Sequence, residues 1–124
     1  MSASYRDLIA WQKAMRMVTS VYRLTEGFPK HELYGLTNQI RRAAVSVPSN
    51  IAEGQGRNSR GEFLQFLGTS KGSLLELETQ IMIAQDLGYC SEAQAVPILG
   101  TTDDVARLIG GLKKPLQRQS PKTG

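Results

Sequence analysis

The sequence contains few of the residues that build metal centres, disulfides and most catalytic sites. Cys90 is the only cysteine and His31 the only histidine among 124 residues. A single cysteine excludes an intrachain disulfide and is typical of a reducing cytoplasm, where we expect the protein to be. We interpret Cys90 as a structural residue at a helix end. Because one histidine and one cysteine cannot form a cluster of zinc ligands, we expect no metal and no cofactor.

Motifs for nucleotide phosphates and for acid–base catalysis are also missing. Gly54, Gly56 and Gly61 lack the spacing of a dinucleotide-binding loop, and a helical pattern precedes them where that loop needs a strand. Residues 70–73, Ser-Lys-Gly-Ser, have the wrong order for a phosphate-binding loop. The polar clusters contain neither histidine nor cysteine to act as a tuned base. We therefore expect that the protein is not an enzyme.

Long hydrophobic runs are absent as well. No uncharged run is longer than Ala43 to Ala52, which is too short and too polar to span a bilayer. Residues 1–7 lack the basic and then apolar pattern of a signal peptide. We therefore expect no contact with membranes. The length suits one domain, which we place at residues 1–117, followed by a flexible tail at residues 118–124.

Apolar residues recur at steps of three and four along four stretches of the chain. A mean step of about 3.5 residues places each set on one stripe of an α-helix. The four stripes are Leu8, Trp11, Met15, Val18 and Tyr22; Leu33, Leu36, Ile40, Ala43 and Val47; Phe63, Leu67, Ser70, Leu74, Leu77, Ile81 and Ala84; and Ile98, Thr102, Val105, Ile109, Leu112 and Leu116. Because the connections are short, the helices can bury these stripes only against one another. The pattern predicts an all-α, antiparallel up-down-up-down four-helix bundle.

Residues that stop helices mark the first boundary. We expect the first helix from about Ser4 to Thr25, because Gly27 and Pro29 both oppose its continuation. Proline has no N–H to lose at the start of a helix, so Pro29 suits the first turn of the second helix.

The second helix contains an internal proline. Apolar spacing continues past Pro48 to Ile51, which favours one helix kinked near Pro48. The alternative is a helix that ends at Val47 and is followed by a separate turn.

Two sequences of the capping-box type precede the last two helices. Residues 59–62, Ser-Arg-Gly-Glu, predict the start of the third helix, which we expect to end near Leu87 because Gly88 follows. Residues 91–94, Ser-Glu-Ala-Gln, predict the start of the fourth helix. The residues that weaken the fourth helix are Pro97, Gly100, Gly110 and Gly111. We therefore expect its start to be broken or delayed.

The third helix carries more apolar surface than one bundle needs. A second stripe lies about 100° around the helix from the first. The second helix has a similar surplus at Ala44, Val45 and Ala52. The surplus predicts a homo-oligomer, although a single bundle with wide core-facing surfaces is the alternative. The expected interface residues are Leu64, Gly68, Leu75, Met82 and Val45.

A polar stripe runs beside the apolar stripe on the second and third helices. We interpret it as a structural network between the helices that fixes their register, with solvated faces as the alternative. The residues expected in this network are Arg42, Ser46, Asn50, Glu53, Ser73 and Glu76.

Basic and acidic residues are separated along the chain. Residues 1–60 hold nine Lys and Arg against four Asp and Glu, whereas residues 61–111 hold two against seven. Residues 112–124 hold four Lys and Arg and no acidic residue. The basic segments suit nucleic-acid phosphates, or the basic hairpin of one subunit contacts the acidic hairpin of the next. Solvated faces without a partner are the third interpretation.

The basic residues expected to contact nucleic acid are Arg16, Arg23, Arg41, Arg42, Arg57, Arg60, Lys113 and Lys114. Aromatic residues that can stack on bases are few. Tyr5, Tyr34 and Tyr89 are the candidates, because Trp11 and Tyr22 fall in a predicted core stripe. We therefore expect contacts to the phosphate backbone of RNA or DNA, with little reading of bases.

Several motifs of the chain resemble a known family. They are Asp7-Leu8-x-x-Trp11-Gln12-Lys13-Ala14; Tyr22-x-x-Thr25-x-x-Phe28-Pro29; the segment from Leu36 to Gly54 that contains Gln39, Arg42, Ala43, Ser46, Pro48 and Asn50-Ile51-Ala52-Glu53; Glu62-Phe63; and Gly72-Ser73-x-x-Glu76-x-Glu78. Together they are similar to the 23S rRNA-intervening sequence proteins over about residues 5–116. Residues 39–54 are the most specific part.

The resemblance implies a four-helix bundle that assembles into a pentameric ring, in a family without agreed catalytic residues. We expect a non-enzymatic, cytoplasmic, bacterial-type homo-oligomer with a basic surface that binds nucleic acid, RNA in particular. The alternative is a protein-interaction scaffold that docks a nucleic-acid-processing partner.

Overall fold

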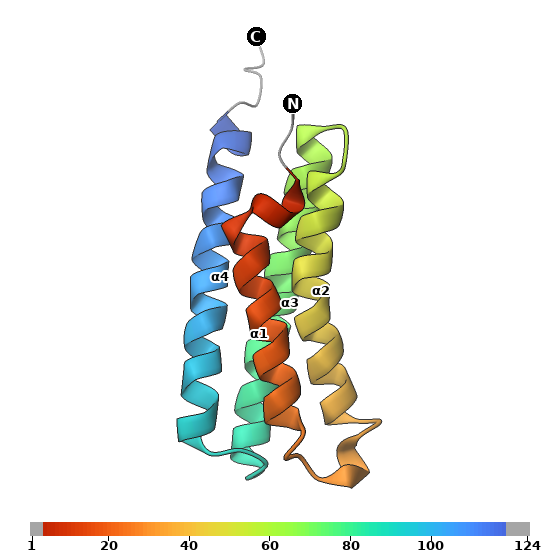
Figure 1. Cartoon of the computed structure of the whole chain (residues 1–124), viewed down its shortest axis with the longest axis vertical. Helices are drawn as coiled ribbons and strands as arrows, with labels where there is room; N and C mark the ends of the chain where they lie inside the picture. The colour runs from red at the N-terminus through yellow and green to blue at the C-terminus, as the bar shows by residue number, and fades with distance from the viewer. Residues whose placement is uncertain (1–3, 119–124) are drawn as a thin grey trace.

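The computed structural model describes residues 4–118, which form four α-helices and two short 3-10 helices (Figure 1). The elements are η1 (Tyr5–Asp7), α1 (Ile9–Thr25), η2 (Lys30–Glu32), α2 (Leu36–Gln55), α3 (Arg60–Asp86) and α4 (Glu92–Arg118). No strand occurs within residues 4–118, so the described chain has the predicted all-α fold.

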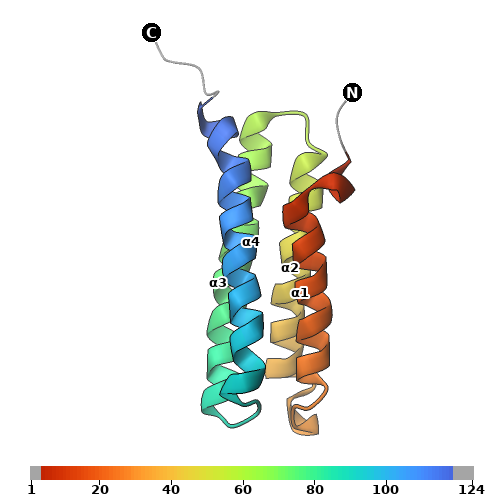
Figure 2. The same cartoon turned by 60° about the vertical axis from the view of Figure 1, so that its left-hand side comes forward.

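Consecutive helices run in opposite directions and lie side by side (Figures 1 and 2). α1 also packs against α4, which closes the bundle. The α2–α3 loop and both ends of the described chain therefore lie at one end, and the other two connections lie at the opposite end (Figure 1). This is the predicted four-helix bundle. The α1–α2 hairpin occupies one side and the α3–α4 hairpin the other (Figure 2).

The core stripes predicted for α3 and α4 are confirmed. The buried residues of these stripes are Leu67, Ser70, Leu74, Leu77, Ile81 and Ala84 in α3 and Ile98, Thr102, Val105 and Ile109 in α4. Phe63, Leu112 and Leu116 pack against the edge of the same core. The 3-4 spacing identifies these faces correctly because apolar residues recur at steps of three and four along one side of each helix.

The core stripe predicted for α1 is wrong by a rotation of the helix. The side chains that α1 buries are Ala10, Ala14, Met17, Val21 and Thr25. Met15 and Tyr22, which were predicted to be core, are 43% and 41% exposed. The small Ala10 and Ala14 face the interior, and the larger Trp11 and Val18 fill the edge of the bundle. Periodicity gives the large residues more weight, so it selected the neighbouring stripe.

The prediction for α2 is partly correct. Ile40, Ala43 and Val47 are buried as expected, but Leu33 precedes the helix and is 48% exposed. Ala44, which was assigned to surplus surface, has no exposed area. α2 packs on both α1 and α3, so a wider part of its surface is covered than a single stripe provides.

Ser59 and Ser91 cap α3 and α4 as predicted, and the reciprocal bond of a capping box forms at Ser91. The Glu62 N–H donates to Ser59 Oγ at 3.1 Å, and the Gln94 N–H donates to Ser91 Oγ at 3.1 Å. The Ser91 N–H donates in return to Gln94 Oε1 at 2.9 Å. These bonds satisfy backbone donors that would have no partner within the first turn of a helix.

The end of α3 also follows the prediction. Gly88 has φ +79°, a left-handed conformation that glycine adopts without a steric penalty. The Gly88 N–H donates to the Gln85 carbonyl at 3.0 Å, and the Tyr89 N–H donates to the Ala84 carbonyl at 2.9 Å. This is the bonding of a Schellman motif, which terminates a helix.

The internal prolines do not interrupt their helices. α4 begins at Glu92 and continues through Pro97, so the expected broken or delayed start is wrong. Pro97 and Pro115 are exposed, which lets water bond the carbonyls that lose a partner. α2 is continuous through Pro48, so the alternative that ends it at Val47 is wrong as well. The kink near Pro48 stays a prediction.

Two further boundaries differ from the prediction. Leu8 is extended, with φ −75° and ψ 124°, and separates η1 from α1 within the predicted first helix. Pro29 is also extended and precedes η2, so α2 begins only at Leu36. Arg118, the first residue of the predicted tail, ends α4, and the rest of that tail lies outside the described residues.

Candidate nucleic-acid interface

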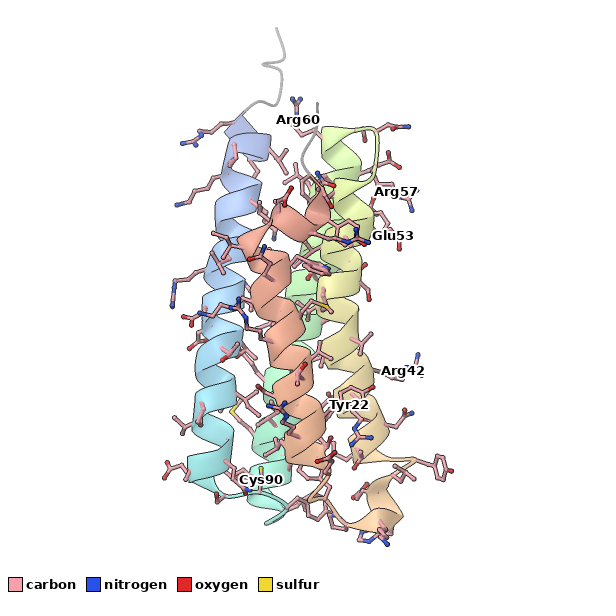
Figure 3. All side chains as sticks on the ribbon, viewed as in Figure 1. Tyr22, Arg42, Glu53, Arg57, Arg60 and Cys90 are labelled. Carbon is pink, nitrogen blue, oxygen red and sulfur yellow. The ribbon has the colours of Figure 1, made fainter. Side chains whose placement is uncertain are left out.

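The eight basic residues predicted to bind nucleic acid do not form one surface. Arg57 and Arg60 lie at the end of the bundle that contains the α2–α3 loop (Figure 3). Lys113 and Lys114 belong to the last turns of α4, at the same end (Figure 1). We call these four residues the end group. Arg41 and Arg42 belong to the first half of α2 and form a second group, which we call the side group.

Within the end group, Arg57 is partly neutralised. Its guanidinium forms an ion pair with Glu53 Oε2 at 2.8 Å and lies 4.9 Å from the centre of the Phe66 ring. Arg60 is half-buried in the first turn of α3. Helix N-termini favour anions and carry free N–H groups, so the position of Arg60 suits a phosphate.

In the side group, Arg41 is held by neutral partners. Its Nε donates to Thr25 Oγ1 at 2.8 Å, and one terminal nitrogen donates to the Tyr22 carbonyl at 3.5 Å. The guanidinium carbon also lies 4.5 Å from the centre of the Tyr22 ring. Arg41 therefore has a defined orientation although no described carboxylate forms an ion pair with it.

Arg42 projects from the outer side of α2 (Figure 3). It lines two adjoining hollows, one shared with Tyr34 and Arg41 and the other shared with Ser73 and Glu76. Within residues 4–118, no ion pair joins Arg42 to Glu76 or to Glu53. The expected role of Arg42 in an internal charge network is therefore not seen in the described geometry.

Arg16 and Arg23 are exposed on the outer face of α1. Seven residues separate them, which places them about 20° apart around the helix. They lie away from the buried stripe of α1 and extend the basic character of the α1–α2 hairpin.

The polar network between α2 and α3 is smaller than predicted. Ser46 Oγ and Ser73 Oγ share a hydrogen bond of 2.8 Å, and Asn50 Nδ2 donates to Ser46 Oγ at 2.9 Å. Asn50 Nδ2 also donates to the Ser46 carbonyl, which keeps the amide close to α2. Of the two expected acidic members, Glu53 bonds Arg57, and Glu76 accepts from Gln80 Nε2 at 3.2 Å. Of the predicted members, Ser46 and Ser73 thus join the two helices, and Asn50 supports Ser46 from within α2.

A contact that the sequence analysis missed joins the two connections at the opposite end. Glu32 Oε1 accepts from the Leu36 N–H at 3.0 Å, and the Tyr89 hydroxyl donates to Glu32 Oε2 at 2.8 Å. These two hydrogen bonds, that of Leu36 foremost, hold the pKa of Glu32 below its ordinary value. The same contact raises the pKa of Tyr89. A glutamate four residues before a helix is a weak signal, and its partner is 57 residues away.

Cys90 lies close to the start of α4 (Figure 3) and is buried in the core. Burial raises the pKa of its thiol, which disfavours the reactive thiolate. This environment agrees with the structural role expected for Cys90.

Two apolar surfaces lie on different sides of the bundle. One is a hollow between α1 and α2, which we call the apolar groove; it contains no charged residue. Its lining residues are Tyr5, Trp11, Met15, Val18, Val45, Pro48, Ser49 and Ala52. The other is the second stripe of α3, in which Leu75 and Met82 are 52% and 48% exposed. Leu64 on this stripe is half-buried and Gly68 is exposed.

No group of three or more His, Cys, Asp or Glu residues within the described chain has the geometry of a metal site. Among the described helices, none combines the length and the apolar character that crossing a membrane requires.

Comparison with known proteins identifies the family. The family model described as 23S rRNA-intervening sequence protein matches residues 6–111. The chain belongs to this family. A crystal structure of an 18% identical protein of unknown function from Bacteroides thetaiotaomicron VPI-5482, assigned to the S23 ribosomal protein family, has the same fold with a TM-score of 0.77. The similarity covers 86% of this chain and 99% of that protein. No curated protein matches the chain.

Membership of the 23S rRNA-intervening sequence proteins confirms the family predicted from the sequence motifs. The matched residues include α1, α2 and α3 entirely and most of α4. They therefore contain the side group and the contact between Ser46, Asn50 and Ser73, whereas Lys113 and Lys114 lie beyond the match.

Proposed function

We propose that the protein is a non-enzymatic homo-oligomer that binds nucleic acid, RNA in particular, mainly through the phosphate backbone. The supporting observation is that most of these cations form no ion pair within the described chain. Of the eight candidate residues, only Arg57 has a described carboxylate within 4.0 Å. Surface cations without internal partners bind phosphates and release the counterions that the phosphates held. The family's name, which refers to 23S rRNA, favours RNA as the ligand.

The two apolar surfaces support the oligomer. A closed ring needs two different surfaces on each subunit, because every contact in it joins one surface of a subunit to the other surface of its neighbour. The apolar groove lies on the α1–α2 hairpin, and the second stripe of α3 belongs to the α3–α4 hairpin. Figure 2 shows these two hairpins on different sides of the bundle. The basic α1–α2 hairpin and the acidic α3–α4 hairpin complement each other in the same head-to-tail arrangement. The resemblance to the family favours a pentamer.

Salt-dependent binding tests the proposed ligand. Purified full-length protein, freed of nucleic acid, is titrated into a fluorescein-labelled RNA hairpin at several potassium chloride concentrations, and binding is followed by fluorescence anisotropy. We expect the affinity to fall steeply with salt, by a slope of about 0.7–0.9 for each phosphate contact. The absence of salt-sensitive binding at low ionic strength overturns the proposal.

A charge-matched control shows whether the end group is involved. The variant Lys114→Ala is expected to weaken RNA binding and to reduce the salt slope by about one contact. Arg107→Ala removes the same charge from the acidic hairpin, where Arg107 is paired with Asp104. We expect Arg107→Ala to bind RNA like the unchanged protein. Equal losses in both variants contradict a role for the end group and indicate a general effect of net charge.

Mass measurement tests the oligomer. Light scattering coupled to size-exclusion chromatography is expected to give a multiple of the 13.6 kDa chain, five-fold for a pentamer. Met82→Glu places a charge in the second stripe of α3 and is expected to lower the mass to that of one chain. Val96→Glu changes an exposed apolar residue of α4 outside the predicted interface and is the control. A single-chain mass for the unchanged protein at all concentrations contradicts the oligomer.

A further inference from the structure

The hollow beside the side group combines cations with exposed aromatic rings. It lies between the end of α1 and the first half of α2, and its volume is about 550 Å³. Its walls include Tyr22, Tyr34, Arg41, Arg42 and Val45. The volume falls within the range of small-molecule sites, about 300–1,000 Å³. We call it the tyrosine–arginine pocket. The apolar groove borders it at Val45 but contains no charged residue.

Arg41 gives this pocket a pre-oriented cation. Its guanidinium is fixed by a hydroxyl, a carbonyl and the face of the Tyr22 ring, none of which carries a charge. Glu26 lines the adjoining hollow together with Arg41, but no ion pair forms between them. A guanidinium held in place by neutral groups keeps its charge available for an anion, and its planar donors fit phosphate oxygens.

The tyrosines give the same pocket flat apolar faces. Tyr34 lies in the turn before α2 and is 92% exposed. Packing within the fold therefore does not explain an aromatic ring at this position. Tyr22 is 41% exposed and was expected in the core. Base–aromatic stacking needs such exposed rings and accepts any base, because every base has a π-face. An anion that also carries a flat aromatic group therefore satisfies both kinds of wall.

We propose that the tyrosine–arginine pocket binds unpaired nucleotides of a single-stranded nucleic acid. A base stacks on Tyr34, and the neighbouring phosphate contacts Arg41 and Arg42. This inference rests on the proposed nucleic-acid binding and specifies one of its sites. It adds stacking on one base to the expected phosphate contacts, and this stacking needs no reading of base edges. A duplex cannot occupy the pocket in this way, because its bases are already stacked inside the helix.

Fluorescence anisotropy with three labelled probes tests the inference. The probes are a single-stranded RNA, a single-stranded DNA of the same sequence, and a blunt RNA duplex, each titrated with the full-length protein at constant salt. We expect the protein to bind the single strands more tightly than the duplex. Tyr34→Ala is expected to weaken single-strand binding at least five-fold and to leave duplex binding unchanged, since a stacked base contributes about 1–3 kcal/mol.

Matched variants separate stacking from folding and from charge. Tyr34→Phe retains the ring and is expected to retain single-strand affinity. Because Tyr34 is almost fully exposed, both variants are expected to melt at the temperature of the unchanged protein. Arg42→Ala is expected to lower the salt slope for the single strand by about 0.7, the value for one phosphate contact. Comparing the loss of affinity of Tyr34→Ala for the single-stranded RNA with its loss for the single-stranded DNA shows whether the pocket distinguishes ribose from deoxyribose.

Several outcomes overturn the inference. One is equal binding of Tyr34→Ala and the unchanged protein to the single strands, and another is an equal loss for strand and duplex. A change of oligomer mass in Tyr34→Ala, with single-strand affinity intact, assigns the pocket to a second copy of the chain. Competition by a poly-glutamate peptide at a concentration equal to that of the RNA assigns it to an acidic protein partner. Duplex binding without a single-strand preference rejects this pocket alone, whereas no binding of any probe rejects the proposed function too.

Discussion

α2 and α3 approach each other closely at Gly54 of α2. A Cβ placed on Gly54 would lie 2.6 Å from the Cβ of Phe66 and 3.0 Å from a ring carbon of Phe63, both in α3. The Cβ of Phe66 is attached to the backbone and cannot rotate away. The variant Gly54→Ala therefore forces α2 and α3 apart next to their loop, although alanine itself favours a helix.

The two effects of Gly54→Ala have opposite signs. Alanine in place of a helical glycine stabilises by about 1 kcal/mol. Overpacking of a filled core destabilises by about 1–3 kcal/mol, and the rigid contact with Phe66 places this site in the upper part of that range. We therefore expect the free energy of unfolding to fall by about 1–2 kcal/mol. Gly100→Ala is the matched control, because its Cβ would meet nothing within 4 Å.

Urea unfolding followed by far-ultraviolet circular dichroism measures both variants at one protein concentration, since an oligomer's stability depends on concentration. We expect Gly54→Ala to unfold at a lower urea concentration than the unchanged protein. Gly100→Ala should unfold at a higher urea concentration, because its free energy of unfolding rises by about 1 kcal/mol. If Gly54→Ala is as stable as Gly100→Ala, the close approach of α2 and α3 does not decide the choice of glycine.

Three further predictions concern contacts between elements. The lowered pKa of Glu32 means that its contribution to stability is complete above about pH 4.5 and is lost as the pH falls through the lower folded pKa. The free energy of unfolding should therefore fall less on acidification in Glu32→Gln than in the unchanged protein. Identical pH dependence of the two proteins would refute this. Ser70→Ala removes the buried hydrogen bond of 2.8 Å from Ser70 Oγ to the Val47 carbonyl and should lower the free energy of unfolding, measured in urea, by about 1 kcal/mol. An unchanged free energy of unfolding would mean that this bond makes no net contribution to holding α2 against α3. Thr25→Val removes the hydroxyl that accepts a hydrogen bond from Arg41 Nε, and it should weaken single-strand binding more than duplex binding in the anisotropy assay. Equal losses of affinity for the single strand and the duplex would argue against a role of Thr25 in positioning Arg41.

Most of the helix boundaries could be predicted from local chemistry. The two Ser-initiated capping boxes and Gly88 mark the starts of α3 and α4 and the end of α3, because each depends on bonds between residues a few positions apart. The prediction of a broken or delayed start of α4 was wrong because it also relied on a local rule, applied at Pro97. A local rule counts the lost hydrogen bond, but it does not show that the freed carbonyl lies at an exposed surface.

The candidate site was less accessible to sequence reasoning. The basic residues themselves are visible from composition, and their segregation into the α1–α2 hairpin and the end of α4 is visible from charge counts. Their grouping in space is not visible in the sequence. The orientation of Arg41, for example, depends on a hydrogen bond to Thr25, which lies sixteen residues away on another helix. Tyr22 was assigned to the core because its spacing fits an apolar stripe, yet it supports the Arg41 guanidinium at the surface.

The sequence by itself determined that this chain forms helices, where α3 begins and ends, and to which family it belongs. Those properties rest on a hydrophobic period, on short-range caps and on motif residues, all of which are written in consecutive positions. Only the tertiary structure decided which of two adjacent stripes of α1 faces the interior. Neighbouring stripes are offset by one residue, about 100° of rotation, and the small Ala10 and Ala14 fit between packed helices where Met15 and Tyr22 do not. The same rotation placed Tyr22 beside Arg41 and so created the pocket between α1 and α2.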